Sequence, residues 1–449
     1  MSDRKQPSAL QRLVAEGSDT DIQRFFVLLR PAEIADLVET LPEEERLRVV
    51  RLMGAPLASD VLREVQEPEL DELLEEMPPD EIAEIVQESR SDDAADLIGS
   101  LTPEKAERTL QNLNQEEQQE IRELLEYGEE TAGGIMQTEL VSVPSDATVA
   151  LAREAVRVAD PKEIGKIYRV YVVDASDRLL GTITPTDLLQ ADERAPVRLA
   201  LDPNPITVRV DVDQERIARL ARENDVAAIP VIDDAGRLLG QVLHDDIADV
   251  LQEEATEDIA RLAGTDEEEF YDDSIAVAVR SRASWLFLTF LGGLLVAGFL
   301  SSVESDIREK AILAAFLPVV LGMAGNVGTQ TSAVTVRSLA LGRMDYESWF
   351  EPVLRQVSIG LILGAMFGVA LFLYAYWRAS EDADLVAVTL GLAIFASMSV
   401  GAVMGVVVPL VIHRIGFDPA ISSSPFIQTT NDLTGAGIIF SVARLTGLI

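Results

Sequence analysis

The sequence holds no cysteine and only two histidines, His244 and His413, among its 449 residues. The lack of cysteine excludes disulfides, thiolate zinc sites, iron–sulfur clusters and cysteine nucleophiles. The shortage of histidine disfavours histidine-rich metal sites and most catalytic triads. The P-loop pattern is also missing, so we do not expect ATP-driven pumping. The expectation is a protein that is not an enzyme. Any metal chemistry must use oxygen ligands.

The net charge of −39 is unevenly distributed along the chain. Residues 275–449 hold 11 acids and 10 basic residues, so nearly all the excess acid lies in residues 1–274. Such an acidic segment repels phosphate, which excludes a nucleic-acid partner. Part of this charge can also reflect adaptation to salt. The first 30 residues are polar and charged, unlike a signal peptide, and we expect the acidic part to stay in the cytoplasm.

Five apolar stretches follow Ser274, each long enough to cross a hydrocarbon core of about 30 Å as a helix. They lie near residues 283–303, 311–335, 353–377, 384–412 and 421–446. On the amino-terminal side of the membrane lie Arg280, Arg282, Arg337, Arg343, Arg355 and Arg414, whereas the opposite loops carry Arg308, Lys310 and Arg378. The positive-inside rule therefore predicts a multi-pass protein of the cell membrane, surrounded by lipid, with cytoplasmic N-terminal domains and its C-terminus outside.

The second apolar stretch contains small and polar residues that a lipid-facing helix does not need. Gly325 and Gly328 leave one side of the helix without side chains, and Asn326 and Gln330 add amide groups. Small residues of this kind let a neighbouring helix approach closely, so one interpretation is helix–helix packing. The other is the wall of a pore, where carbonyls and amides meet a hydrated solute.

The fifth apolar stretch contains one acid, Asp432, well inside it. An ionised aspartate at mid-bilayer costs about 2.5–3.5 kcal/mol, and no deep Lys or Arg is available to pair with it. Gln428 lies four residues earlier and so shares its helix face, Asn431 is adjacent, and Ser424 begins the polar run. One interpretation is that Asp432 makes a structural hydrogen bond. The other is a cation site, whose oxygen ligands would suit Mg²⁺, Ca²⁺ or Mn²⁺. A homodimer with a pore on its two-fold axis would bring two such aspartates together.

A repeat is visible in the middle of the chain at a constant offset of 59 residues. Residues 171–189 match residues 230–248, and each copy predicts a strand, a turn, a strand and a helix. The pattern resembles a tandem pair of CBS modules, which often bind adenosine nucleotides such as ATP. Thr184 and Asp187 of the first copy resemble the nucleotide signature, while Leu243 replaces the hydroxyl residue in the second. The alternative is a purely structural module.

Helical spacing predicts an all-α N-terminal domain, and its segments beginning at Pro31 and Pro79 repeat one pattern. This favours a small superhelix of paired helices over residues 1–130. After the second CBS copy, an acidic helix leads toward the first membrane span. Its carboxylates form either a solvated face or a surface that divalent cations bridge.

This domain order resembles the MgtE family of magnesium channels over nearly the whole chain. The resemblance implies an acidic N domain (1–130), a CBS pair (131–251, with copies at about 137–196 and 197–251), a connecting helix (247–274) and a five-helix transmembrane domain (275–449). It implies a homodimer with a central Mg²⁺ pore at Asp432, lined by Gly325 and Gly328, that cytosolic Mg²⁺ closes. The matching regulatory acids are Asp92, Asp96, Asp246, Asp249, Glu254 and Glu257. Relatives commonly carry Asn where this chain has Ser424, so the outer hydration contacts can differ.

Three other interpretations stay open. The transported ion can be Co²⁺ or Mn²⁺ instead of Mg²⁺. A chloride channel or CBS-bearing efflux protein is a second alternative, although those families usually place the CBS modules after the membrane region. The third is a membrane-anchored nucleotide sensor without transport, which leaves Asp432 unexplained.

Overall fold

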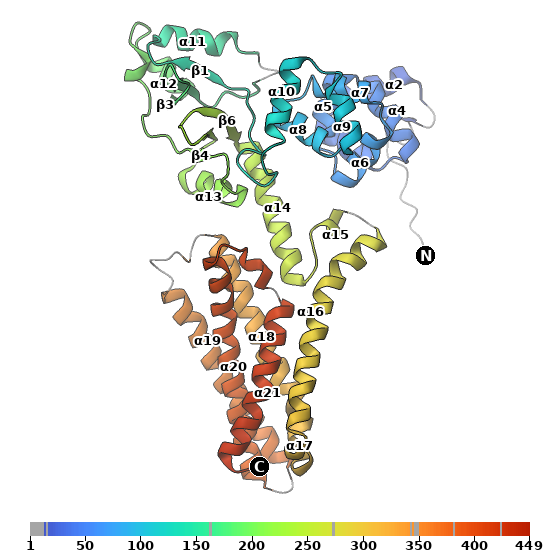
Figure 1. Ribbon diagram of the computed structural model, residues 1–449, viewed down its shortest axis with the longest axis vertical. Helices are drawn as coiled ribbons and strands as arrows, with labels where there is room; N and C mark the ends of the chain where they lie inside the picture. Colours follow the sequence, from blue (N-terminus) through green and yellow to red (C-terminus); the bar gives the residue numbers. More distant parts are fainter. Residues whose placement is uncertain are drawn as a thin grey trace. The chain divides into compact units, whose positions relative to one another are not determined.

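The computed structural model describes residues 13–14, 17–160, 164–271, 274–341, 344, 350–379, 382–422 and 424–449. It forms two compact units, Met1–Gln252 and Glu253–Ile449 (Figure 1). Arg343 and the side chains of Arg308 and Ser424 lie outside the described residues.

The first part of unit 1 is helical, as the sequence predicts. Its helices are α2 (Asp19–Phe26), α3 (Pro31–Glu39), α4 (Glu43–Met53), α5 (Ala55–Leu62), α6 (Glu67–Glu76), α7 (Pro79–Val86), α8 (Ser91–Gly99), α9 (Pro103–Leu110) and α10 (Gln115–Leu124). The repeated prolines Pro31, Pro79 and Pro103 each begin a helix, where the missing N–H leaves no bond unmade. Several helices pack on the helix two places further along the chain, such as α3 on α5 and α5 on α7.

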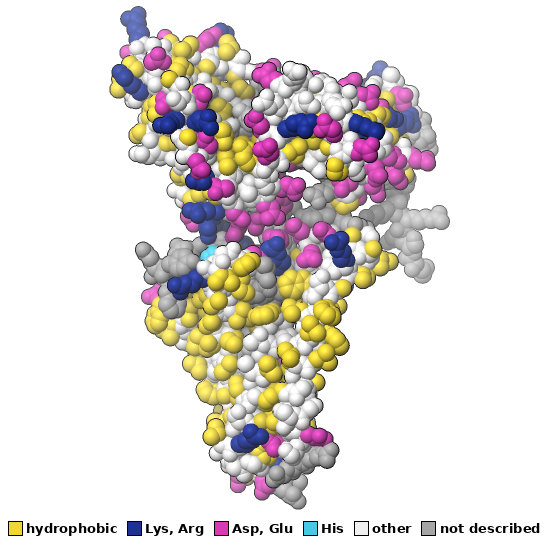
Figure 2. Space-filling view, viewed as in Figure 1, with side chains coloured by type: hydrophobic (Ala, Val, Ile, Leu, Met, Phe, Trp, Pro, Cys, Tyr) yellow, Lys and Arg dark blue, Asp and Glu magenta, His cyan; other side chains and the backbone are white. Residues whose placement is uncertain are grey.

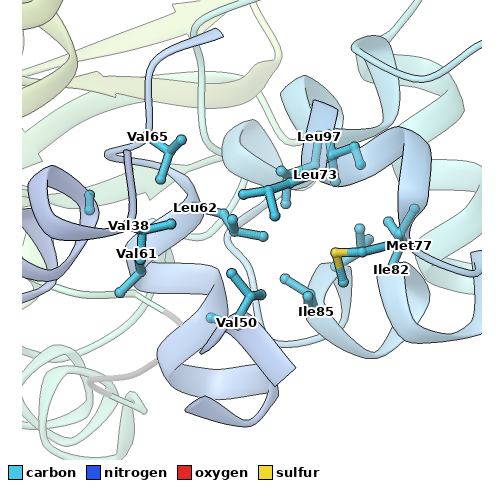
Figure 3. Packing of buried hydrophobic residues seen from close by; sticks show 14 of the residues in the cluster. Val38, Val50, Val61, Leu62, Val65, Leu73, Met77, Ile82, Ile85 and Leu97 are labelled. Atoms are coloured by element: carbon cyan, nitrogen blue, oxygen red, sulfur yellow. The ribbon is translucent and has the colours of Figure 1, made fainter. Parts of the chain in front are cut away.

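One apolar core runs through these helices. Val38, Leu62, Ile82 and Ile98 are almost fully buried in it, and Figure 3 shows how side chains of this cluster from several helices meet. Ala95 of α8 and Leu124 of α10 belong instead to the core of the second CBS copy. The helical domain is thereby joined to that copy within one unit.

Each CBS copy folds into a three-stranded sheet, in agreement with the repeat. In the first, β1 (Val141–Pro144) pairs in parallel with β2 (Val170–Val173), which pairs antiparallel with β3 (Leu179–Ile183). In the second, β4 (Val208–Arg209), β5 (Ala228–Ile232) and β6 (Leu238–Leu243) repeat this order. The helices of the pair are α11 (Val149–Val158), α12 (Pro185–Gln190), η1 (Val197–Leu199) and α13 (Gln214–Asn224).

The two hairpin turns of the repeat have matching backbone geometry. Asp177 and Gly236, 59 residues apart, both have positive φ, 60° and 79°. Asn, Asp and Gly tolerate this region best, which explains the residue types. The turns also contact each other: Leu179 N donates to Gly236 O at 3.0 Å, and Leu238 N donates to Asp177 O at 2.9 Å. These bonds join the two copies at their hairpin turns.

Unit 2 consists of long helices: α16 (Ile275–Ser302), α17 (Glu304–Glu309), α18 (Ala311–Ala340), α19 (Phe350–Arg378), α20 (Ala383–Arg414), η2 (Pro419–Ser422) and α21 (Ser424–Thr446). Among the described residues, α16, α18, α19 and α20 are long and apolar enough to cross a membrane. Helix α21 has 23 residues, but its polar run keeps it out of this group, so a count of five spans stays a prediction. Figure 2 shows the hydrophobic side chains that cover this unit and the acids that gather on unit 1.

Several helix bounds differ from the sequence-based expectation, and the largest differences are at α16 and at the connecting helix. Helix α16 begins at Ile275 instead of near residue 283. The expected start counted only apolar residues, whereas a helix can continue past the bilayer surface and carry polar residues such as Arg280 and Arg282 there. The acidic connecting helix α14 (His244–Ala263) ends before residue 274. It stops at Gly264, whose φ is +79°, and Thr265 N donates to Ala260 O at 3.0 Å. A short helix, α15 (Glu268–Tyr271), follows.

Candidate functional site

Helix α21 carries the acid that the sequence singled out inside the membrane unit. Asp432 is half-buried, and Gln428 Nε2, one turn earlier, donates to its Oδ1 at 3.4 Å. Within the described part of the chain, no Lys or Arg lies at ion-pair distance from this carboxylate, so it has no neutralising side chain. A carboxylate beside an amide is a ligand set for a hard cation such as Mg²⁺.

Two glycines of α18 let α21 approach at this level. A Cβ on Gly325 would collide with the side-chain amide of Gln428, and a Cβ on Gly328 would collide with Nδ2 of Asn431. Gly322, one turn earlier, has open space around the same position. The structure therefore gives Gly325 and Gly328 a steric role that Gly322 lacks.

The predicted pore residues divide into two groups. Gly325, Gly328, Gln428 and Asn431 meet at the interface of α18 and α21, beside Asp432. Asn326 and Gln330 are exposed and lie on another face of α18. Asn431 is fully buried, and both of its amide atoms lack a hydrogen-bond partner among the described residues. Ser424 begins α21, and its side chain lies outside the described residues.

The acidic residues of unit 1 gather around an arginine that sequence reasoning missed. The Arg90 guanidinium lies 3.1 Å from Asp93 and 3.9 Å from Asp92, both in the first turn of α8. It also lies 3.9 Å from Asp246 in the first turn of α14. The structure thus brings Asp92 and Asp246 around one basic side chain. Acids in a first turn are also favoured by the helix dipole.

Burial sets the protonation of this cluster. Burial and the neighbouring carboxylate of Asp92 raise the pKa of Asp246 to about 8, despite Arg90. Burial also raises the pKa of Asp92, and burial with the charge of Asp92 raises the pKa of Asp93 to about 6. Burial opposes the charge on Arg90, but the surrounding carboxylates outweigh it and raise the pKa of the guanidinium.

The other predicted acids of unit 1 lie further out. Asp96 and Asp249 both lie toward the surface. The Asp249 carboxylate is still partly shielded from water, and this shielding together with the charge of Glu64 raises its pKa. In the part of the chain that the structure describes, no three His, Cys, Asp or Glu side chains converge as a metal site. Asp92, Asp93, Asp245 and Asp246 instead each lie 3.1–3.9 Å from the Arg90 guanidinium.

In unit 2, the acidic end of α14 is tied to the loop before η2. Arg261 forms ion pairs with Glu257 and with Asp418, and Asp418 Oδ1 accepts a bond from Ala420 N at 2.8 Å. Asp258 lies 3.8 Å from Arg337.

Burial raises the pKa of Glu257 to about 8. Glu254 is half-buried on the same helix. The i,i+4 spacing of Glu257 and Arg261 is visible in the sequence, but Asp418 is far away along it.

The candidate nucleotide residues cap a helix. Thr184 is the N-cap of α12: its Oγ1 accepts from Asp187 N at 3.0 Å and donates to Asp187 Oδ2 at 2.6 Å. A hydroxyl and a carboxylate held side by side at a helix N-terminus match the donors and acceptors that a ribose offers. Both residues are partly exposed, Thr184 at the end of β3 and Asp187 in the first turn of α12.

An acidic helical domain, a CBS pair and a membrane unit with one unpaired internal carboxylate define a membrane transport protein for cations. Sequence models of the MgtE family agree: the intracellular N domain matches residues 29–130, CBS domains match 132–194 and 197–253, and the divalent cation transporter domain matches 317–442. The chain belongs to the MgtE family.

Relatives of known function cover almost all of the chain. The magnesium transporter MgtE of Thermus thermophilus is 35% identical over 97% of both chains. The magnesium transporter MgtE of Enterococcus faecalis is 38% identical over 74% of this chain and 72% of that one. Among solved structures, the cytosolic domain of the Mg²⁺ channel MgtE in complex with ATP has 34% identity and a TM-score of 0.51, and it matches 54% of this chain and 98% of that one.

Proposed function

We propose that this chain is a Mg²⁺ channel that lets magnesium enter the cell down its electrochemical gradient. An inside-negative potential supplies about 2.3 kcal/mol per charge per 100 mV, and twice that for a divalent ion. The observation that carries the proposal is Asp432, a carboxylate inside the membrane unit with Gln428 beside it and no basic partner in the described residues. The family membership supports Mg²⁺ as the ion.

The pore is proposed to form between two copies of the chain. One Asp432 with one amide supplies too few ligands for a hydrated divalent ion, and a two-fold axis would double this set. Asn326 and Gln330 are exposed polar side chains in a membrane helix, α18. A second copy of the chain or a water-filled path would give their amides hydrogen-bond partners. In this arrangement α21 is the fifth span and the C-terminus lies outside.

Closure by cytosolic Mg²⁺ is the second part of the proposal. The acids Asp92, Asp96, Asp246 and Asp249 of unit 1 and Glu254 and Glu257 of unit 2 would bind Mg²⁺ when its concentration rises. The neighbouring carboxylates support this: besides burial, the charges of Asp92 and Asp245 raise the pKa of Asp246, and those of Glu254, Glu267 and Asp418 raise the pKa of Glu257, so added positive charge would relieve repulsion at both places. Mg²⁺ bridging would then hold the acidic modules together and close the pore.

Nucleotide binding is a finer proposal. Thr184 and Asp187 would hold an adenosine nucleotide through its ribose, and the structural relative in complex with ATP supports this choice of ligand. The second copy has Leu243, which is buried and apolar, at the matching position. One nucleotide per chain is therefore expected.

A flux assay tests the transport proposal. Purified protein in liposomes should take up Mg²⁺ faster than protein-free liposomes when the interior is negative, and Co²⁺ and Mn²⁺ should be compared in the same assay. Faster uptake of Mg²⁺ supports the proposal. Uptake of Co²⁺ or Mn²⁺ alone would favour the alternative ions. Adenosine-nucleotide binding without any flux would favour a membrane-anchored sensor.

A further inference from the structure

Arg90 occupies the middle of the acidic cluster of unit 1. Its guanidinium lies 3.1–3.9 Å from carboxylate oxygens of Asp92, Asp93, Asp245 and Asp246. The Arg90 side chain is 13% exposed, and those of Asp92 and Asp246 are 8% and 18% exposed. These charges are therefore screened less than surface ion pairs are.

Neighbouring hydrogen bonds fix the position of this arginine. Its NH1 donates to Gln137 Oε1 at 3.1 Å, and Gln137 is fully buried and pairs through its backbone with Gln241 of β6. The next residue, Ser91, donates from N and Oγ to Glu139 at 2.9 and 2.8 Å. The start of α8 is thus anchored to the segment that precedes β1. Arg90 is a held side chain and not a mobile surface arginine.

The arginine connects two elements that are far apart in the sequence. Asp92 and Asp93 belong to α8 of the helical domain, whereas Asp245 and Asp246 begin α14 after the second CBS copy. Without Arg90, these four carboxylates would keep only Arg63, whose guanidinium lies 3.9 Å from Asp93, as a basic neighbour at ion-pair distance among the described residues. A divalent cation would meet the same need, since it too neutralises carboxylates from both elements.

We propose that Arg90 is a built-in cation that competes with Mg²⁺ for these carboxylates and so sets the Mg²⁺ concentration at which the channel closes. This inference rests on the closure proposed above and names its regulating residue. At low Mg²⁺, Arg90 holds the helical domain against the start of α14. At high Mg²⁺, the ion must displace the guanidinium, which weakens the apparent affinity of the cluster.

Replacement of Arg90 therefore has two opposite effects that a merely structural residue would not produce. The Arg90→Met and Arg90→Gln variants should hold unit 1 together less well without Mg²⁺. They should also respond to less Mg²⁺, with a midpoint lowered by about ten-fold, because no tethered charge competes. Arg90→Lys keeps the charge and should stay within about three-fold of the wild type.

Limited proteolysis of the full chain in nanodiscs over a Mg²⁺ titration measures both effects. Chymotrypsin is suitable because it does not cleave at arginine. Arg108→Met is the matched control: this exposed arginine pairs with Glu104, 2.7 Å away, and none of its ion pairs in the described structure involves the cluster. Basal Mg²⁺ flux of each variant in liposomes, measured without internal Mg²⁺, reports folding.

The outcomes separate the two proposals. Lower protection without Mg²⁺, together with a lowered midpoint in both uncharged variants and not in Arg108→Met, supports the role of Arg90. A protected wild type whose midpoint is unchanged or raised in Arg90→Met and Arg90→Gln overturns that role and leaves the closure proposal intact. A wild type that Mg²⁺ never protects overturns the closure proposal and this inference with it.

Discussion

Gln428 donates a hydrogen bond to Asp432 one helical turn later, and the same Gln428 amide rests on the bare backbone of Gly325. The glycine therefore positions the amide, and the amide positions the carboxylate. The hydrogen bond lies within α21 and the glycine contact joins α18 to α21, so the spacing of the two helices acts on the acid through Gln428.

The first prediction concerns the close approach of the two helices. Gly325→Ala should lower Mg²⁺ flux in liposomes by about ten-fold or more, because the new methyl group collides with Gln428 and displaces it from Asp432. Overpacking of this kind typically costs about 1–3 kcal/mol. The thermal unfolding midpoint of the purified protein should fall as well.

Gly322→Ala is the matched control on the same helix. Its Cβ would meet open space, and alanine favours a helix over glycine by about 1 kcal/mol. We expect unchanged flux and an equal or higher unfolding midpoint. Equal flux in the two variants would contradict the positioning role of Gly325.

A second prediction concerns Thr184. Thr184→Val removes the hydroxyl that caps α12 and bonds Asp187, so the chain should lose ATP binding and about 1 kcal/mol of stability. Thr184→Ser keeps the hydroxyl and should retain both. Calorimetric titration of the full chain with ATP measures the first effect and thermal unfolding the second. ATP binding by Thr184→Val at wild-type affinity would rule out this residue as a ligand.

The third prediction is a pH dependence that arises from Asp246. Its pKa is about 8 in the folded chain and about 3.9 in an unfolded one, so the folded state binds the extra proton between these values. Stability should therefore fall as pH rises toward about 8, by at most about 1.4 kcal/mol per pH unit, and then level off. Unfolding measured in chelator from pH 6 to 9 reports this slope.

Asp246→Asn removes one of the two carboxylates with a pKa of about 8 and should reduce the slope of the same curve, while Glu257 keeps its own contribution. The substitution keeps the size of the side chain, so a general packing defect would shift the whole curve without changing its slope. Identical slopes in the wild type and the variant would show that another group titrates.

Much of the architecture could be predicted because it depends on local patterns. The repeat at an offset of 59 residues placed both CBS hairpins, and the structure shows Asp177 and Gly236 at the same turn position. Prolines at regular positions marked the helix starts at Pro31 and Pro79. Apolar run length indicated the membrane helices, although α16 is longer and α14 shorter than expected.

The parts that could not be predicted depend on tertiary contacts. The spacing of Arg90 and Asp93 suggests a local pair, but the approach of Asp246 joins residues more than 150 positions apart. The same holds for Arg261 and Asp418. Polarity alone grouped Asn326 and Gln330 with Asn431. In the structure, Asn326 and Gln330 lie on an exposed face of α18, whereas Asn431 of α21 is buried.

The central claim is that Mg²⁺ crosses the membrane unit past Asp432. The measurement is Mg²⁺ uptake by liposomes that contain Asp432→Asn, compared with wild type and with Asp384→Asn, which alters an exposed acid in the first turn of α20. We predict that Asp432→Asn loses about ten-fold or more of the flux and that Asp384→Asn retains it. Wild-type flux in Asp432→Asn would contradict the account.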